Sequence, residues 1–211
     1  MTDSTHCRPL PLAGVSEHDL KRMDRLAEGI LRLIDPLQIE LARTPRDLEC
    51  AYRLRFQTAR DRGWISPEQF PSGREQDEHD DSALQIVAIE GDAVVGTARI
   101  ILPAPGRRLP AERMFTWNAD DRGCMVEVGR ICRDPHSTSG PRVFFGLIGK
   151  VWIEMRKRNF TVCCGVADIN MIHVYEDVGF DVVRMAPPRL HWGEERWPVV
   201  IRPVNSRRTA A

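Results

Sequence analysis

The chain has 211 residues, and its 30 Lys and Arg residues are balanced by 30 Asp and Glu residues. This length favours a single domain with one hydrophobic core. The balanced charge, without a basic stripe interleaved with aromatic residues, gives no support to a nucleic-acid partner. No uncharged apolar segment reaches the ~18 residues of a membrane span, and no signal peptide is recognisable, so we expect a cytoplasmic protein.

The cysteine pattern argues against a metal site. The six cysteines lie at positions 7, 50, 124, 132, 163 and 164 and form no Cys-x-x-Cys pair. Structural zinc needs ligand pairs at short spacing, and the histidines do not supply them. We therefore expect no metal and no bound cofactor. Cys163 and Cys164 lie in an apolar run and are expected to act as small hydrophobic side chains on a strand.

Start signals mark the first helix and the elements that follow it. Residues 1–15 are expected to form a loose leader. Ser16 and Asp19 form a capping box, and apolar residues at helical spacing then predict an amphipathic helix that ends before Pro36. The alternation over 37–42 predicts a first strand.

A second helix is predicted from Thr44 to about Arg60. Thr44 is placed as its N-cap, Pro45 occupies its first position, and Asp47 favours the positive end of the helix dipole. Residues 63–81 are rich in Pro, Gly and charge and predict a long ordered loop, a kind of loop that is usually functional.

Three strands are predicted next. Leu84–Ile89 and Ala93–Leu102 form a hairpin, and Cys124–Cys132 forms a further strand. Because side chains alternate along a strand, Glu127 and Arg130 are expected on opposite faces of it.

A small-residue turn at 136–141 leads into another helix. A strand, a Gly/Ser turn and a helix N-terminus in that order make a site for an anion. The buried side of the helix is expected to carry Phe144, Leu147, Ile148, Val151, Trp152 and Met155.

The last predicted elements are a strand at Thr161–Val166, a helix at Asn170–Val178 that ends at Gly179, and strands at Phe180–Arg184 and Val199–Ile201. This order of helices and strands predicts an α+β fold, a mixed twisted sheet with helices on both faces.

Charged residues interrupt segments that otherwise look like core, at Arg55, 75–80, Arg99 and 127–130. Ionised side chains are almost never buried unless they are paired or used, because desolvation costs several kcal/mol per ion. The pattern therefore predicts a cleft lined by paired Asp, Glu and Arg.

Several motifs in this order resemble a group of N-acyltransferases with the GNAT fold. The group includes the acyl-homoserine-lactone (autoinducer) synthases of quorum sensing and the N-acyl amino acid synthases. The motifs are Tyr-x-Leu-Arg at 52–55, Gly63-Trp64, Glu-x-Asp-x-x-Asp at 75–80, Val95–Arg99, Phe115 and Glu127-x-x-Arg130. The resemblance covers about residues 37–203 and implies a GNAT-like sheet with a splayed strand pair that admits the pantetheine arm of an acyl donor.

The resemblance also implies a domain organisation. Residues 36–205 would form the N-acyltransferase domain, preceded by a leader and amphipathic helix at 1–35 and followed by a tail at 206–211.

Two residues are candidates for proton transfer. Glu127 can take the proton that an acceptor ammonium must lose, directly or through a water. Its alternative role is that of a buried partner of Arg99 or Arg130. Tyr175, with Gly179 and Phe180, is similar to a GNAT segment whose tyrosine protonates the departing thiolate. The alternative is that Tyr175 only packs on the sheet.

The acceptor pocket would be shaped by an ion-pair network with aromatic walls. The network residues are Arg55, Asp77, Asp80, Arg99 and Arg130, and the walls are Trp64 and Phe115. A role in anchoring the loop is the alternative for Trp64.

The acyl donor is expected at the end of the 124–132 strand and the following turn. The donor-binding residues would be Ile131, Cys132, Arg133, Ser139 and Gly140. The phosphate-binding pattern of acetyl-CoA enzymes is not evident there, so we expect a weak hold on the diphosphate of CoA. Acyl carrier protein is the preferred donor, and acyl-CoA is the alternative. Lys150 and residues 156–158 would supply a basic docking face for the carrier, or simply a solvated helix face.

Departures from the autoinducer pattern bear on the acceptor. Ala59 and Gly129 replace residues that those synthases favour, which weakens the case for S-adenosylmethionine, whereas 71–80, 99–103 and 192–198 look more like N-acyl amino acid synthases. We expect transfer of a fatty acyl group to the amine of an amino acid or amino-acid derivative. Homoserine-lactone formation from S-adenosylmethionine and a non-catalytic acyl-binding module are the alternatives.

Overall fold

The computed structural model describes residues 16–115 and 125–203. The strands are β1 (Gln38–Leu41), β2 (Leu84–Glu90), β3 (Ala93–Ile101), β4 (Val126–Arg133), β5 (Cys163–Ala167), β6 (Phe180–Arg184), β7 (Arg189–His191) and β8 (Glu194–Pro203). The helices are α1 (Glu17–Leu33), α2 (Pro45–Asp61), α3 (Pro110–Phe115), α4 (Pro141–Arg156) and α5 (Ile169–Val178). The expected leader, the tail, Cys7 and Cys124 lie outside the described residues.

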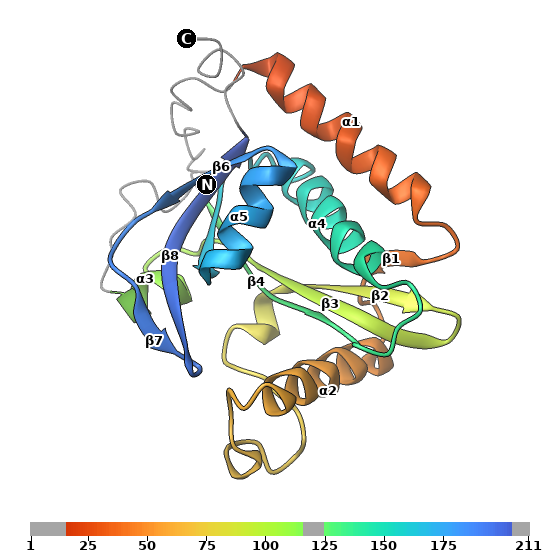
Figure 1. The fold of residues 1–211 in the computed structure, drawn as a ribbon, viewed down its shortest axis with the longest axis vertical. Helices are drawn as coiled ribbons and strands as arrows, with labels where there is room; N and C mark the ends of the chain where they lie inside the picture. Colours follow the sequence, from red (N-terminus) through yellow and green to blue (C-terminus); the bar gives the residue numbers. More distant parts are fainter. Residues whose placement is uncertain (1–15, 116–124, 204–211) are drawn as a thin grey trace, which may run out of the picture.

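The strands form one sheet in the order β1-β2-β3-β4-β5-β8-β6, with β7 paired to β8. Helices α1 and α4 lie on one face of the sheet and α2 on the other (Figure 1). This is the predicted α+β architecture with helices on both faces. Among the helices described, none is long and apolar enough to cross a membrane.

Local start signals fix the first two helices. Ser16 Oγ accepts a hydrogen bond from the N–H of Asp19 at 3.2 Å, and Thr44 Oγ1 accepts one from the N–H of Asp47 at 3.1 Å. In both helices the acidic side chain also accepts from the N-cap N–H, so both capping boxes are complete. The predicted N-termini are confirmed.

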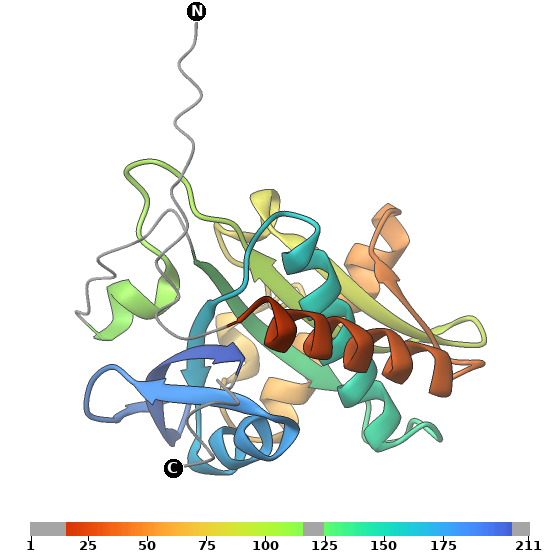
Figure 2. The same cartoon turned by 90° about the horizontal axis from the view of Figure 1, so that it is seen from above.

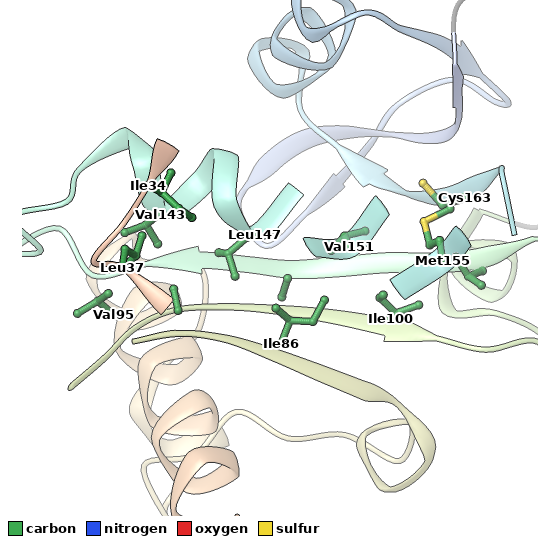
Figure 3. Packing of buried hydrophobic residues seen from close by; sticks show 13 residues of the cluster. Ile34, Leu37, Ile86, Val95, Ile100, Val143, Leu147, Val151, Met155 and Cys163 are labelled. Atoms are coloured by element: carbon green, nitrogen blue, oxygen red, sulfur yellow. The ribbon is translucent and has the colours of Figure 1, made fainter. Parts of the chain in front are cut away.

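The main core lies between α4 and the sheet, as the labelled side chains of Figure 3 show. Gly96 permits this contact, because a Cβ atom there would collide with Val143 of α4. Helix α1 lies alongside α4 (Figure 2), and its buried residues share a core with Trp152 and Phe180. The indole N–H of Trp152 donates to Asp24 Oδ1 at 2.8 Å, which ties the two helices together.

Strands β4 and β5 part soon after they begin. They pair in parallel only at Val126 with Cys163 and at Glu127 with Cys164, although β4 continues to Arg133 and β5 to Ala167. The predicted splay is therefore present, and it opens toward the C-terminal ends of both strands, next to the N-terminus of α4.

Gly165 lies where the two strands begin to part. A Cβ atom at this position would come within 2.6 Å of the Val128 carbonyl oxygen. We expect Gly165→Ala to destabilise the protein by about 1–3 kcal/mol, because the two strands must move apart. Gly129→Ala is the matched control in β4, since a Cβ there meets nothing within 4 Å. Urea unfolding of both variants is the measurement, and equal stability would contradict the expectation.

A β-bulge in β4 changes the face of the sheet on which the Arg130 side chain lies. Strands β3 and β4 shift register between Thr97 and Arg99, and Arg130 has a positive φ of 54°. A bulge adds one residue and resets the alternation of side chains. Arg130 and Arg99 both reach Asp77, and Glu127 shares the face of Arg99. The expectation that Glu127 and Arg130 lie on opposite faces is wrong.

The C-terminal strands also differ from expectation. Strand β8 begins at Glu194 rather than near Val199, and β7 and α3 were not predicted. Strand β8 pairs with β7 up to Arg196 and with β6 from Val199 onward, so Pro198 falls where the partner changes. Its missing N–H removes no hydrogen bond to either of these strands. The 63–81 loop is ordered as expected and contains two short 3₁₀ turns.

Candidate active site

Asp80 is the centre of a buried ion-pair network on the α2 face of the sheet. Its carboxylate accepts from both terminal nitrogens of Arg55 at 2.8 and 3.0 Å, from Arg99 Nη1 at 3.0 Å and from Gln85 Nε2 at 2.7 Å. Arg55 is 1% exposed and Arg99 is 2% exposed. Burial raises the pKa of Asp80, but the hydrogen bonds and charges of the two arginines outweigh it and hold that pKa well below its usual range.

Glu75 extends the network to Arg130. Its carboxylate accepts hydrogen bonds from Arg55 Nε at 2.5 Å and from Arg130 Nη2 at 2.9 Å. The carboxylate of Asp77 accepts from Arg99 Nη1 at 2.7 Å and from Arg130 Nη2 at 3.2 Å, and so links these two arginines. The five residues predicted for the network are thus mutually paired. Glu75 was not among them, although it is 2% exposed and lies in the same acidic stretch. The acidic stretch at 75–80 indicated that carboxylates are buried here. It could not show which of them point inward, because side chains in a loop follow no regular alternation.

Four segments supply this network: α2, the acidic loop at 75–80, β3 and, through Arg130, β4. Arg55 lies on the buried side of α2, and Arg99 lies on β3 opposite Gln85. The acidic loop is tied to α2 by a hydrogen bond from the N–H of Glu75 to the carbonyl of Tyr52 at 3.1 Å. The network therefore joins α2, the loop and the sheet, and removal of a member strands the other charges in the core.

Glu127 lies on the same face as the network but makes no ion pair among the described residues. It is 7% exposed, and its carboxylate accepts a hydrogen bond from the N–H of Ala111 at 2.9 Å. Burial raises the pKa of Glu127 to about 7, although the Ala111 hydrogen bond and the charges of Arg99 and Arg130 act against the rise. A carboxylate with this pKa is suited to take up and release a proton near neutral pH. The alternative role of Glu127, that of a direct ion-pair partner of Arg99 or Arg130, does not fit, because its carboxylate forms no ion pair with either arginine in the described residues.

Tyr175 lies on the opposite face of the sheet. Its side chain packs among apolar residues of α1, α4 and α5, close enough to Cys163 for the thiol to affect its ionisation. Burial raises the pKa of Tyr175, so the hydroxyl stays protonated. The packing is what the structural alternative requires, and the raised pKa makes the hydroxyl a weaker acid than a solvent-exposed tyrosine.

Aromatic and cationic side chains close the network on the side of β8. The Arg196 guanidinium lies 4.4 Å from the Trp64 ring centre, Arg130 lies 4.7 Å from Trp192, and the two indoles are 6.0 Å apart. Trp192 and Gly193 form the β7–β8 turn with φ values of 52° and 73°. A tryptophan held at positive φ is strained, and such residues cluster at functional sites.

Sequence reasoning gave Trp192 and Arg196 no role, although it noted the segment that contains them. For Trp64 the contacts fit the loop-anchoring role, since it is half-buried between Arg62 and Arg196. Phe115 is 3% exposed in α3, one helical turn after the Ala111 N–H that holds Glu127.

The residues assigned to the donor divide between two places. Ile131 packs on the α4 side, and the Cys132 thiol lies toward α2, close to Thr58. Arg133 is exposed at the end of β4, whereas Ser139 and Gly140 lie in the turn before α4. Burial raises the pKa of Cys132 to about 11, so this thiol remains protonated and is not a nucleophile.

The turn before α4 binds its own backbone N–H groups. The acceptors are Asp134 Oδ1 for His136, Asp134 O for Ser137, Glu90 Oε2 for Thr138, Ser137 Oγ for Ser139, Ser137 O for Gly140, Ser139 O for Arg142 and Gly140 O for Val143. Residue 141 is proline and has no N–H. Every N–H from 136 to 143 therefore has a partner, and the expected anion site has no unbonded donor of this kind to offer.

The basic residues that were predicted to form a docking face, Lys150 and residues 156–158, make internal pairs. Lys150, Lys157 and Arg158 pair with the buried carboxylate of Glu154 at 3.1, 3.0 and 2.8 Å. Arg156 pairs with Asp24 of α1 at 3.1 Å. Arg156, Lys157 and Arg158 lie at the C-terminal end of the 16-residue helix, about 24 Å from the end where the splay opens, and Lys150 lies about 14 Å from that end. Three of these cations share the single carboxylate of Glu154, so this region keeps a net positive charge, and the docking face for the donor stays a prediction.

A pocket of about 620 Å³ lies against the far side of the network. Tyr52, Arg74, Asp80 and Gln85 are among its lining residues. Neither Glu127 nor any residue of β4 or β5 lines it. The pocket is therefore separate from Glu127 and from the splay.

Three solved structures share the fold at low sequence identity. The acyl-homoserine-lactone synthase LasI aligns with a TM-score of 0.65 and 18% identity over 79% of this chain and 88% of LasI. FeeM, an N-acyl amino acid synthase from uncultured soil microbes, aligns with a TM-score of 0.58 and 17% identity over 80% of this chain and 90% of FeeM. BjaI, a CoA-dependent acyl-homoserine lactone synthase, aligns with a TM-score of 0.63 and 20% identity over 75% of this chain and 77% of BjaI. Identities this low show the fold alone, and it is the fold of the GNAT acetyltransferases, which also align.

No curated protein sequence matches the chain. A family model for the N-acyl amino acid synthase FeeM matches residues 50–193, more than half of the chain. The matched region begins in α2, contains the whole ion-pair network and Glu127, and ends in the β7–β8 turn. The chain therefore belongs to the FeeM N-acyl amino acid synthase family and is an N-acyltransferase.

Proposed function

We propose that the protein transfers a fatty acyl group from acyl carrier protein to the amine of an amino acid or amino-acid derivative, with Glu127 as the general base. The observation that carries this proposal is the state of Glu127. It is a buried carboxylate without a counter-ion among the described residues, at the last paired position of the splay, with a pKa raised to about 7. Such perturbed groups are typical of catalytic acids and bases.

The proposed reaction needs three proton transfers, because the acceptor nitrogen loses two protons and the leaving sulfur gains one. Glu127 takes a proton from the acceptor ammonium, and the neutral amine nitrogen attacks the thioester carbonyl carbon. The C–N bond forms, the C–S bond breaks, and the pantetheine thiolate leaves. Tyr175 would donate its hydroxyl proton to that thiolate from the other face of the sheet and regain a proton from solvent. Glu127 would release the ammonium proton to solvent and then take the second proton from the acylated nitrogen, which leaves the neutral amide.

The acceptor would lie between Glu127 and the ion-pair network. Arg130 and Asp77 are the network members with exposed side-chain surface, at 22% and 31%, and the Arg130 guanidinium lies 4.7 Å from the Trp192 ring centre. The FeeM family match supports an amino acid over S-adenosylmethionine as the acceptor. The bonded turn before α4 supports a carrier protein over CoA as the donor, since a free diphosphate finds no unbonded N–H there.

Mass spectrometry of the reaction products tests the proposal. The purified protein is incubated with acyl carrier protein loaded with fatty acyl chains, and with single amino acids or S-adenosylmethionine. We expect an N-acyl amino acid. An acyl-homoserine lactone would identify the alternative acceptor, and the absence of product from every pair would favour an acyl-binding module without catalysis.

Tyr175→Phe separates proton donation from packing. The substitution keeps the ring in its apolar cluster and removes only the hydroxyl. We expect kcat to fall by about tenfold or less, because a thiolate is a tolerable leaving group without a proton donor. Single-turnover kinetics with acyl carrier protein measure this. A complete loss of activity, with Glu127→Gln still active, would reverse the two assignments.

A further inference from the structure

The carboxylate of Glu90 is bound by the turn before α4. Glu90 ends β2, and it accepts hydrogen bonds from Ser137 Oγ at 3.2 Å, Thr138 Oγ1 at 2.7 Å, Thr138 N at 3.3 Å and Ser139 Oγ. Four donors from three consecutive residues thus converge on one side chain. The hydrogen bonds from Ser139 and Thr138 lower the pKa of Glu90, so the group is ionised at neutral pH.

The carboxylate of Glu90 binds the turn that was predicted to bind an anion. The turn follows a strand, carries three hydroxyls and precedes a 16-residue helix whose first residue is Pro141. A phosphate at this turn would need the hydroxyls that Glu90 holds, and it would meet a negative charge at short range. The protein's own anion therefore competes with any anion of a ligand.

We propose that Glu90 makes the enzyme select against CoA and in favour of donors that carry the acyl pantetheine without a nucleotide. The inference rests on the acyl transfer proposed above, and it assigns donor specificity to a residue outside the ion-pair network. Removal of Glu90 frees three hydroxyls and the N–H of Thr138, and it removes the repelling charge.

Binding of CoA tests the inference without an acceptor. Isothermal titration compares CoA with pantetheine, which lacks the nucleotide and its phosphates. We expect the parent to bind CoA no more tightly than pantetheine. Glu90→Ala should tighten CoA binding by about tenfold, the effect of one charge-assisted contact, and leave pantetheine unchanged. Glu90→Gln keeps an oxygen for the hydroxyls and should show a smaller gain.

Asp92→Ala is the matched control, because Asp92 lies two residues away in the same hairpin and accepts the hydrogen bond of Arg46 through its backbone carbonyl. It should leave both affinities unchanged. Thermal unfolding of each variant shows whether the turn is still folded. A parent that binds CoA tenfold more tightly than pantetheine would overturn the inference, as would a Glu90→Ala variant with unchanged CoA affinity.

Donor kinetics complete the test. Acyl carrier protein, acyl-CoA and acyl-pantetheine are compared as donors, and we expect Glu90→Ala to raise kcat/KM about tenfold for acyl-CoA alone. An equal change with all three donors would mean that Glu90 only holds the turn together and would overturn the inference. If no donor reacts while Glu90→Ala still gains CoA affinity, the proposed function fails and the inference about donor binding stands.

Discussion

Glu127→Gln is expected to lower kcat by about 10²–10⁴ at neutral pH, because it removes the proposed base and keeps the shape of the side chain. The amide oxygen can still accept the N–H of Ala111. In the parent, kcat/KM should rise toward pH 7 as Glu127 ionises and then level. The variant should lose this rise. Its residual rate should increase with pH, because more of the acceptor amine is then neutral without a base.

The stability of the same variant separates loss of chemistry from loss of fold. The folded-state pKa of Glu127 is raised from 4.5 to about 7, so ionisation costs stability as the pH rises from 4.5 to 7. Gln carries no such cost, and above pH 7 the variant should be more stable than the parent by at most about 3 kcal/mol. Urea unfolding at pH 4, 6 and 8 measures this. A control, Glu195→Gln, changes an exposed carboxylate and should alter neither rate nor stability. A variant with parental kcat would remove Glu127 from the mechanism.

Arg55→Ala is expected to abolish activity and to lower the free energy of unfolding by about 3–5 kcal/mol. Arg55 is 1% exposed and binds both Glu75 and Asp80, so its removal leaves two carboxylates buried with fewer partners. Arg53→Ala is the matched control on the same helix. Arg53 pairs with Glu49 at the surface, and such pairs contribute about 0–1 kcal/mol. Equal effects of the two changes in urea unfolding would contradict a buried network.

The network also predicts how stability depends on acid. The folded-state pKa of Asp80 is depressed, so its contribution is fully present above the unfolded value of 3.8 and is lost as the pH falls below it. We expect the free energy of unfolding to fall steeply below about pH 4. Asp80→Asn should be much less stable at pH 7 and should lose less on acidification. An unfolding curve for the parent that is flat between pH 5 and pH 2 would rule this out.

Local chemistry allowed much of this protein to be predicted from its sequence. The helix beginnings at Ser16 and Thr44 depend on side chains that cap N–H groups three residues later, and both were predicted and found. The left-handed glycine at Gly179 ends α5 for a similar reason, since only glycine adopts that conformation without strain. The charged residues inside apolar segments required partners, because isolated ions are not buried. In the structure these residues pair with one another in the network. The resemblance carried by these motifs gave the fold and the class of reaction.

Other features depend on contacts between distant segments, and only the tertiary structure decided them. The facing of Arg130 depends on a bulge whose position is set by pairing with β3, so alternation within one strand could not give it. The pairing of Trp192 with Arg130 requires the β7–β8 turn to reach across the splay. Glu90 and Ser139 are 49 positions apart, and no local rule brings a carboxylate at the end of a hairpin onto a distant turn. The sequence by itself determined the helix starts and the class of enzyme, whereas three-dimensional packing decided which charges meet, because ion pairs and close approaches join residues that no sequence period relates.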